Sequence, residues 1–339
     1  MPRLKKSTLL RIFESALHKS GISFLRLSSE MEHPAVYQLV NYVNSFRLRV
    51  YIWNLTFGGR IQLPDEWRIQ VTGLPVVRGG QQFVPDIGGK TVILGWCEEL
   101  EVFAAYDIRK HLGILGGSPS IQIRQPALEK ARINGLASHF KGEEEVAFAI
   151  KPSYMAAYLE NMEDLHACGS SEEALRILDE ICKDPNKVNE KDIQDHVPEL
   201  RRWAVVSTKK ALRDANFKDR VLTAYSQTCA MCGVQLRLID AAHLLPAAHP
   251  ESTDETSNGI ALCALHHRAF DSALVTFDVD YRIHRNLSKE RELANSGLDV
   301  GLAGFSEKLL PQINLPQNLK DRPSSKYLEK VNAMRGWAV

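Results

Sequence analysis

Two pairs of metal-ligating side chains constrain the fold of this chain more than any other feature. Cys229 and Cys232 form a C-x-x-C pair, and Cys263 and His266 form a C-x-x-H pair with the same spacing. Each pair closes a tight turn that directs both ligands toward one ion, and Gly233 suits such a turn. Four such side chains fill the tetrahedral coordination of Zn²⁺, so we predict a structural zinc site without an open position.

The other cysteines and the apolar runs bear on the compartment. Cys97, Cys168 and Cys182 stand outside this cluster, and we predict that they are small buried side chains. Close cysteine pairs bind metal more often than they form disulfides in a reducing compartment. The basic start of the chain is followed by no long apolar stretch, and no run of about 18 apolar residues occurs. We therefore expect a cytoplasmic protein with no membrane partner.

The length of 339 residues exceeds one ordinary domain, and the apolar pattern predicts an α+β fold. Helical spacing of apolar residues predicts helices over 7–18 and 31–45. Alternation and glycine turns then predict strands over 47–54, 66–72, 90–96, 101–106 and 144–151. Helical spacing returns over 171–183, and Pro198 begins a basic helix that extends toward Tyr225. We therefore expect a mixed α+β domain over 1–160, a helical linker over 161–200 and a second domain over 201–339.

Charge is divided unevenly along a chain whose formal net charge is only +1. Residues 160–199 are rich in acidic side chains, whereas residues 201–220 are rich in basic ones and lead toward the cysteine cluster. A net charge near zero gives weak support for a nucleic-acid partner, because the phosphate backbone attracts basic surfaces. In and after the basic segment, Lys218, Arg220 and Arg268 are candidate contacts to DNA.

The segment between the two ligand pairs carries a second group of chemically active residues. Residues 236–246 alternate at first and predict a strand, with Asp240 and His243 near its end. A polar loop follows, and residues 260–270 predict a helix that carries Cys263 and both adjacent histidines. His267 and Asp271 are four residues apart, so they share one helix face and together suit a hard cation such as Mg²⁺ or Mn²⁺. Because adjacent helical residues point about 100° apart, His266 can face the zinc while His267 faces another site.

Residues 229–271 resemble the HNH endonucleases of the ββα-metal, zinc-knuckle type found in many bacterial restriction enzymes. The three letters of that name match His243, Asn258 and His267. The resemblance implies that His243 is the general base and that Asn258 fixes the loop and orients the base. It also implies that His267 and Asp271 hold the catalytic cation, with Asp240 as a further metal-ligand candidate. The sequence departs from many relatives at Ala242, where they carry a second His or Asp.

The resemblance implies a metal-dependent DNA endonuclease of restriction type, with double-stranded DNA as substrate. Cutting both strands requires two active sites, so we expect a homodimer. The domain over 1–160 would supply sequence or modified-base specificity, because such nuclease modules have little preference of their own. Aromatic side chains with nearby basic ones are candidates for base stacking and phosphate contacts there: Arg47, Arg49, Tyr51, Trp53, Trp67, Arg68, Arg78, Trp96, Tyr106 and Lys110.

Two alternatives remain open at this point. The first is an HNH defence effector whose N-terminal domain senses a ligand and gates cleavage. The second is a DNA-binding protein that keeps the zinc knuckle and has lost catalysis, which the alanine at position 242 makes conceivable. The recognition sequence, the effect of base modification and the cut position are not encoded in any motif that we find.

Overall fold

The structure is a computed structural model that describes residues 3–30, 32–40, 45–77, 79–117 and 119–338. The chain divides into two compact units, Met1–Ala215 (unit 1) and Asn216–Val339 (unit 2). The division falls inside the long helix α6 (Glu199–Ala224), so the expected boundaries at 160 and 200 both lie within unit 1. In the described part of the chain, no helix has the length and apolar character needed to cross a membrane.

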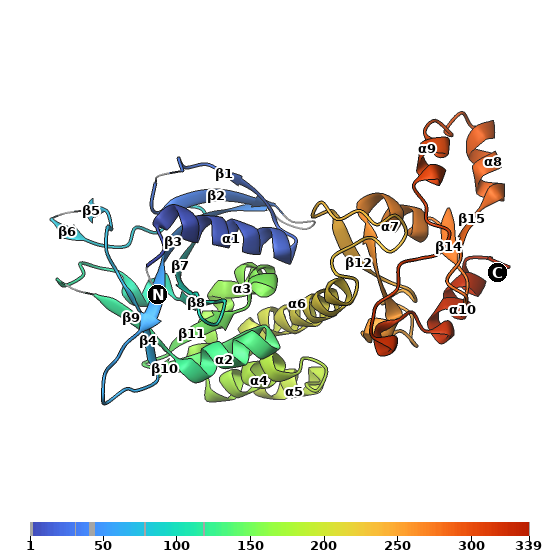
Figure 1. The fold of residues 1–339 in the computed structure, drawn as a ribbon. Helices are drawn as coiled ribbons and strands as arrows, with labels where there is room; N and C mark the ends of the chain where they lie inside the picture. The colour runs from blue at the N-terminus through green and yellow to red at the C-terminus, as the bar shows by residue number, and fades with distance from the viewer. Residues whose placement is uncertain (1–2, 31, 41–44, 78, 118, 339) are drawn as a thin grey trace. The chain divides into compact units, whose positions relative to one another are not determined.

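Unit 1 is built on a nine-stranded mixed sheet whose main path runs β1-β2-β3-β7-β8-β11-β10 (Figure 1). Neighbouring strands on this path are antiparallel, except that β3 and β7 are parallel. The far end of β3 also pairs with β4, which in turn pairs with β9. The strands of unit 1 are β1 (Ser23–Arg26), β2 (Ala35–Val40), β3 (Ser45–Phe57), β4 (Glu66–Gln70), β5 (Val76–Val77), β6 (Gly80–Gln81), β7 (Lys90–Cys97), β8 (Val102–Tyr106), β9 (Ser120–Arg124), β10 (Leu136–Gly142) and β11 (Glu145–Ile150).

The central strands of this sheet are buried on both faces. Side chains along a strand alternate between the faces, and β3 sends Val50 and Ile52 into one apolar core and Tyr51 and Trp53 into another. Helices supply the rest of each core. The first core includes residues of α1 (Lys6–Ser20), α3 (Met155–Ala167), α4 (Glu172–Lys183), α5 (Glu190–His196) and α6, and the second includes residues of α2 (Gln125–Asn134).

Most of the secondary structure expected in unit 1 is confirmed, but the helix expected over 31–45 is wrong. Residues Ala35–Val40 form the strand β2, in which Ala35, Tyr37 and Leu39 are buried and alternate with less buried residues. Pro34 disfavours the helical conformation at the residue before it. The backbone pairing of residues 35–40 with β1 and β3 then makes this segment a strand. Residues 41–44 lie outside the described residues.

The aromatic residues expected to stack on bases are instead part of the cores. Tyr51, Trp53, Trp67, Trp96 and Tyr106 are all at most 8% exposed. Buried rings have no free face for a base, so stacking on a nucleic acid by these five side chains is excluded in this conformation. Arg78 lies outside the described residues.

The segment over 161–200 does not form a separate linker. Ile177, Leu178 and Ile181 of α4 and Ile193 of α5 are at most 1% exposed and belong to the first core of unit 1. The helical periodicity was therefore predicted correctly. The role of these helices differs from the expectation, because their apolar residues belong to the core of unit 1.

Unit 2 contains a short hairpin, β12 (Ile239–His243) with β13 (Gly259–Cys263), followed directly by α7 (Ala264–Asp271). A second hairpin joins β14 (Val275–Phe277) to β15 (Ile283–Arg285). The unit also contains the end of α6 and the helices α8 (Leu287–Asn295), α9 (Leu302–Glu307) and α10 (Ser325–Met334). The helix expected over 260–270 is thus partly wrong. Its first residues form β13, because their backbone pairs with β12, and the helix begins only after Cys263.

A buried-core substitution tests whether α4 belongs to unit 1. We predict that Ile181→Ala lowers the free energy of unfolding of unit 1 by about 2–5 kcal/mol, because it leaves a cavity in a packed core. Ile133→Ala in α2 is the matched control, since that side chain is 81% exposed and its truncation leaves no cavity. Chemical denaturation measures both variants, and equal stability of Ile181→Ala and the wild type would contradict the assignment.

Candidate active site and metal centre

The four predicted zinc ligands lie together in unit 2. The ligand atoms of Cys229, Cys232, Cys263 and His266 all lie within 4.8 Å of one another. The His266 Nδ1 atom is 3.5 Å from Cys229 Sγ and 3.3 Å from Cys263 Sγ, and the Cys232 and Cys263 sulfurs are 4.0 Å apart. Tetrahedral zinc with ordinary bond lengths requires S···S separations of about 3.8 Å and S···N separations of about 3.5 Å. The residues present therefore fit a zinc ion.

Burial favours metal binding by the histidine and opposes it at the cysteines. It lowers the pKa of His266, which keeps the imidazole neutral as a ligand must be. It raises the pKa of the Cys229 and Cys232 thiols, so zinc must displace protons from them. Zinc affinity is consequently expected to rise with pH.

His243, the predicted general base, lies at the end of β12 and is held on two sides. Its ring stacks on Phe217 of α6, with centroids 3.8 Å apart and planes 6° apart. Its Nε2 atom is 3.3 Å from Asp254 Oδ1, and both side chains are less than one-fifth exposed. The sequence reasoning did not identify Asp254 or Phe217, because neither stands at a diagnostic spacing from His243.

Asn258 ties down the loop that separates β12 from β13. Its side chain is fully buried and accepts a hydrogen bond from the backbone N–H of Leu245 at 2.9 Å. The same amide donates to the Thr253 carbonyl at 2.8 Å and to Ser252 Oγ at 3.0 Å. One side chain next to β13 thus holds the start of the loop, at Leu245, and its middle, at Ser252 and Thr253, directly before Asp254.

The next residue, Gly259, allows α6 to approach this hairpin. Gly259 is the register partner of His243 in the β12–β13 pair. A Cβ atom at this position would meet Val221 Cγ2 at 2.3 Å and Phe217 Cζ at 2.9 Å. Only glycine therefore lets Phe217 lie where it stacks on His243.

His267 and Asp271 meet on one face of α7, as their spacing predicts. His267 Nε2 is 3.5 Å from Asp271 Oδ2, and the other carboxylate oxygen, Oδ1, lies 3.6 Å from the Arg335 guanidinium. His266, the neighbour of His267, faces the sulfurs instead, so the adjacent histidines serve two different places. Helix α7 packs against β12, β13 and β14.

Asp240 does not join His267 and Asp271 as a cation ligand. It forms an ion pair with Lys218 at 2.9 Å, and strand alternation places it on the opposite face of β12 from His243. Apart from the cysteine-histidine cluster, no set of three or more Cys, His, Asp or Glu ligand atoms lies as close together in the described residues.

The three DNA-contact candidates have different environments. Lys218 is engaged with Asp240, and Arg220 donates a hydrogen bond to the backbone carbonyl of Asp254. Arg268 is exposed on α7, next to His267. Arg268 is thus presented to solvent, whereas Arg220 supports the loop beside His243.

Comparison with known protein families identifies this constellation. Residues 229–278 match the family model described as HNH endonuclease, and this range contains the four predicted zinc ligands, His243, Asn258, His267 and Asp271. These residues form an HNH endonuclease domain. The protein is therefore a nuclease, and its α+β architecture with a C-terminal HNH domain is confirmed.

Two further comparisons concern the rest of the chain. Residues 46–159, upstream of the HNH domain, match the family model described as Methylase-associated X1. A solved structure titled "Modification dependent TagI restriction endonuclease" is 11% identical, with a TM-score of 0.29 over 86% of this chain and 81% of that chain. At that TM-score the likeness does not establish a shared fold. The search of curated proteins found no match.

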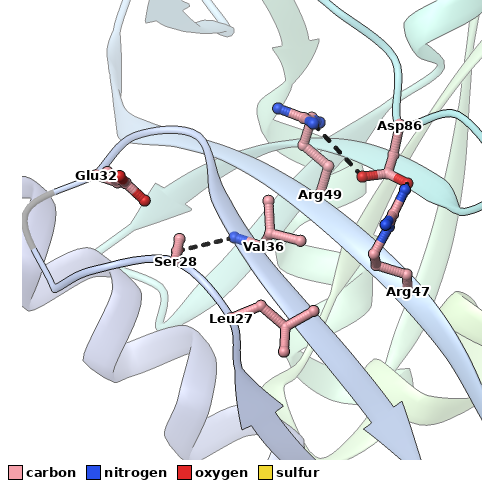
Figure 2. A pocket seen from close by; sticks show the side chains of 7 residues that line it. All are labelled: Leu27, Ser28, Glu32, Val36, Arg47, Arg49 and Asp86. Atoms are coloured by element: carbon pink, nitrogen blue, oxygen red, sulfur yellow. Dashed lines mark hydrogen bonds and ion pairs between the residues drawn. The ribbon is translucent and has the colours of Figure 1, made fainter.

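Outside the HNH domain, unit 1 has a shallow cavity of about 330 Å³ (Figure 2). Its polar end is formed by Arg47 and Arg49 of β3, which both reach Asp86, at 2.7 Å and 3.5 Å. The Asp86 carboxylate is almost fully buried, whereas the two arginine side chains are 44% and 26% exposed. Glu32 lies across the cavity from this group.

Zinc removal tests the metal centre of the HNH domain. We predict one zinc per chain, and we predict that Cys263→Ser loses it and no longer folds unit 2 cooperatively, because structural zinc contributes about 10–16 kcal/mol of apparent binding free energy near pH 7. Elemental analysis and thermal unfolding measure the two effects. Cys168→Ser, a buried cysteine outside the cluster, should retain the metal. Full zinc content in Cys263→Ser would refute the site.

Proposed function

We propose that this nuclease is a restriction-type enzyme that hydrolyses phosphodiester bonds of double-stranded DNA, with His243 as the general base. The observation that carries the proposal is the position of His243 inside the HNH domain, stacked on Phe217 and in contact with Asp254. A histidine is suited to taking a proton from water near neutral pH. A carboxylate beside it stabilises the imidazolium that forms and holds the ring in one orientation.

His267 and Asp271 are the residues that we propose to hold a divalent cation, Mg²⁺ or Mn²⁺. Their side chains lie on one face of α7 and offer one nitrogen and one carboxylate, a donor set that fits such an ion with water completing the shell. When bound, the ion would act as a Lewis acid for a phosphate oxygen and the leaving oxygen. Cleavage of both strands needs two active sites, which supports a homodimer.

Unit 1 is the proposed source of specificity. It contains the range that matches the methylase-associated model, and it is a separate compact unit with its own cores. Since the aromatic candidates are buried, the arginines of the cavity, the exposed Arg47 and the partly exposed Arg49, are the better contacts to DNA. Guanidinium groups bind phosphate in a planar, bidentate way and thereby position a domain on the duplex.

Removing the base tests the catalytic proposal. We predict that His243→Ala lowers cleavage of plasmid DNA by about 10²–10⁴-fold while DNA binding is kept, because general-base catalysis contributes on that order. Gel-based cleavage and binding assays with Mg²⁺ or Mn²⁺ measure both quantities.

The matched control is His284→Ala, which removes the histidine of another histidine-aspartate pair in unit 2, His284 with Asp278 at 2.7 Å. It should cleave like the wild type. Undiminished cleavage by His243→Ala would exclude the general-base role. A wild-type protein that cuts only after an activator is added would favour the ligand-gated effector.

The arginine pair of unit 1 is tested by the salt dependence of binding. We predict that Arg47→Gln with Arg49→Gln reduces the slope of log K against log salt by about 1 for each phosphate that the variant no longer neutralises. Glutamine can still donate to Asp86, so the buried carboxylate keeps a partner. Arg176→Gln, an exposed arginine paired with Glu180 on α4, is the control. An unchanged slope would rule out binding of phosphate by this pair, and parallel digestion of methylated and unmethylated plasmid shows whether modification matters.

A further inference from the structure

Helix α10 (Ser325–Met334) lies outside both family-model matches, yet this helix and Arg335 directly after it contact both parts of the proposed active site. We propose that α10 is a positioning element of this active site and that Tyr327 is its principal positioning residue, holding the loop that carries Asp254 in contact with His243. This inference rests on the proposed function of His243.

The contacts at the start of α10 are made to the loop on either side of Asp254. The Tyr327 hydroxyl lies 2.8 Å from Thr253 Oγ1 and 3.2 Å from Glu255 Oε2, the residues directly before and after Asp254. Lys330, one turn further along the helix, forms an ion pair with Glu251. The backbone N–H of Ser324 donates to the Ser257 carbonyl at 3.0 Å. The start of the helix therefore contacts the second half of the loop, at four residues between 251 and 257.

Tyr327, which makes the central contacts, is held firmly by its surroundings. The Tyr327 side chain is 3% exposed and belongs to the core of unit 2 together with Leu328 and Val331 of the same helix. A ring packed in this way presents its hydroxyl at one position. By contrast, Thr253 and Glu255 are exposed, so the outer side of the loop has little packing of its own.

The end of α10 and the residue after it reach the other part of the active site. Arg335 donates to the Phe270 carbonyl at 2.7 Å and lies 3.6 Å from Asp271. Asn332 donates to the Phe277 carbonyl and accepts from Thr276, which ties the helix to β14. One element thus links the loop of Asp254 to the end of α7, where Asp271 lies.

The physical consequence concerns the His243–Asp254 contact, which is 3.3 Å long and depends on where the loop lies. Asn258 holds the loop through Ser252 and Thr253, and Tyr327 holds it through Thr253 and Glu255. Ordering a loop costs conformational entropy, and contacts already made in the free enzyme remove that cost from the reaction. Loss of the Tyr327 hydroxyl should therefore lower the fraction of molecules in which Asp254 meets His243.

The experiment removes the hydroxyl and keeps the ring. We expect Tyr327→Phe to lower kcat for DNA cleavage about tenfold with little change in KM, because the buried Tyr327 ring is not itself available to the substrate. The matched control is Tyr225→Phe in the same core, whose hydroxyl has no hydrogen-bond partner among the described residues; it should keep the wild-type kcat. Zinc content and thermal unfolding establish that each variant is folded.

A double-mutant cycle separates positioning from a general loss of stability. If Tyr327 acts through Asp254, its substitution should have almost no further effect in an Asp254→Asn background. Thr253→Val removes the nearer of the two loop partners of the hydroxyl from an exposed position and leaves the other, Glu255. It therefore gives the same test if Tyr327→Phe does not fold, with a smaller loss of kcat expected.

The outcomes are distinguishable. A wild-type kcat for Tyr327→Phe or for Thr253→Val, together with an inactive His243→Ala, overturns the positioning role and leaves the nuclease proposal intact. Fully additive effects of Tyr327→Phe and Asp254→Asn also overturn it. Retained cleavage by His243→Ala overturns the proposed function and this inference with it.

Discussion

The clustering of three thiols and one imidazole is the interaction on which the rest of unit 2 depends. It joins the turn at 229–232 to the end of β13, and backbone bonds such as Ala230 N–H to the Ala261 carbonyl run beside it. Because Cys263 is also the residue from which α7 starts, a zinc ion there would fix the origin of the helix that carries His267 and Asp271. A small domain with a modest apolar core gains much from such a staple.

Around that staple, the candidate base is oriented by elements that lie far apart in the chain. Phe217 comes from α6, Asp254 from the loop after β12, and Gly259 from the start of β13. Each acts for a different reason: ring stacking fixes the plane of the imidazole, the carboxylate fixes its rotation, and the absence of a Cβ lets α6 approach. The site is thus a product of packing as much as of its reactive groups.

In unit 1, the residue types that suggested nucleic-acid binding have a structural role instead. Its aromatic residues, which look suited to nucleic acid in the sequence, fill two cores on either face of a sheet. Strands buried on both faces need large apolar side chains at successive positions, and β3 and β7 supply them. Of the side chains named as candidates for recognition, the arginine pair beside Asp86 keeps solvent exposure, and the buried carboxylate holds both arginines in place.

The sequence by itself determined the cysteine-histidine cluster, the likeness to HNH endonucleases and most helices and strands, because residue type, spacing and periodicity are local properties of the chain. The tertiary structure decided everything that depends on pairing across long separations. It made residues 35–40 and 259–263 strands, turned Asp240 to Lys218 and incorporated the segment over 161–200 into a core. It also brought Asp254 and Tyr327 to the proposed active site, since their contacts join residues that no local pattern relates.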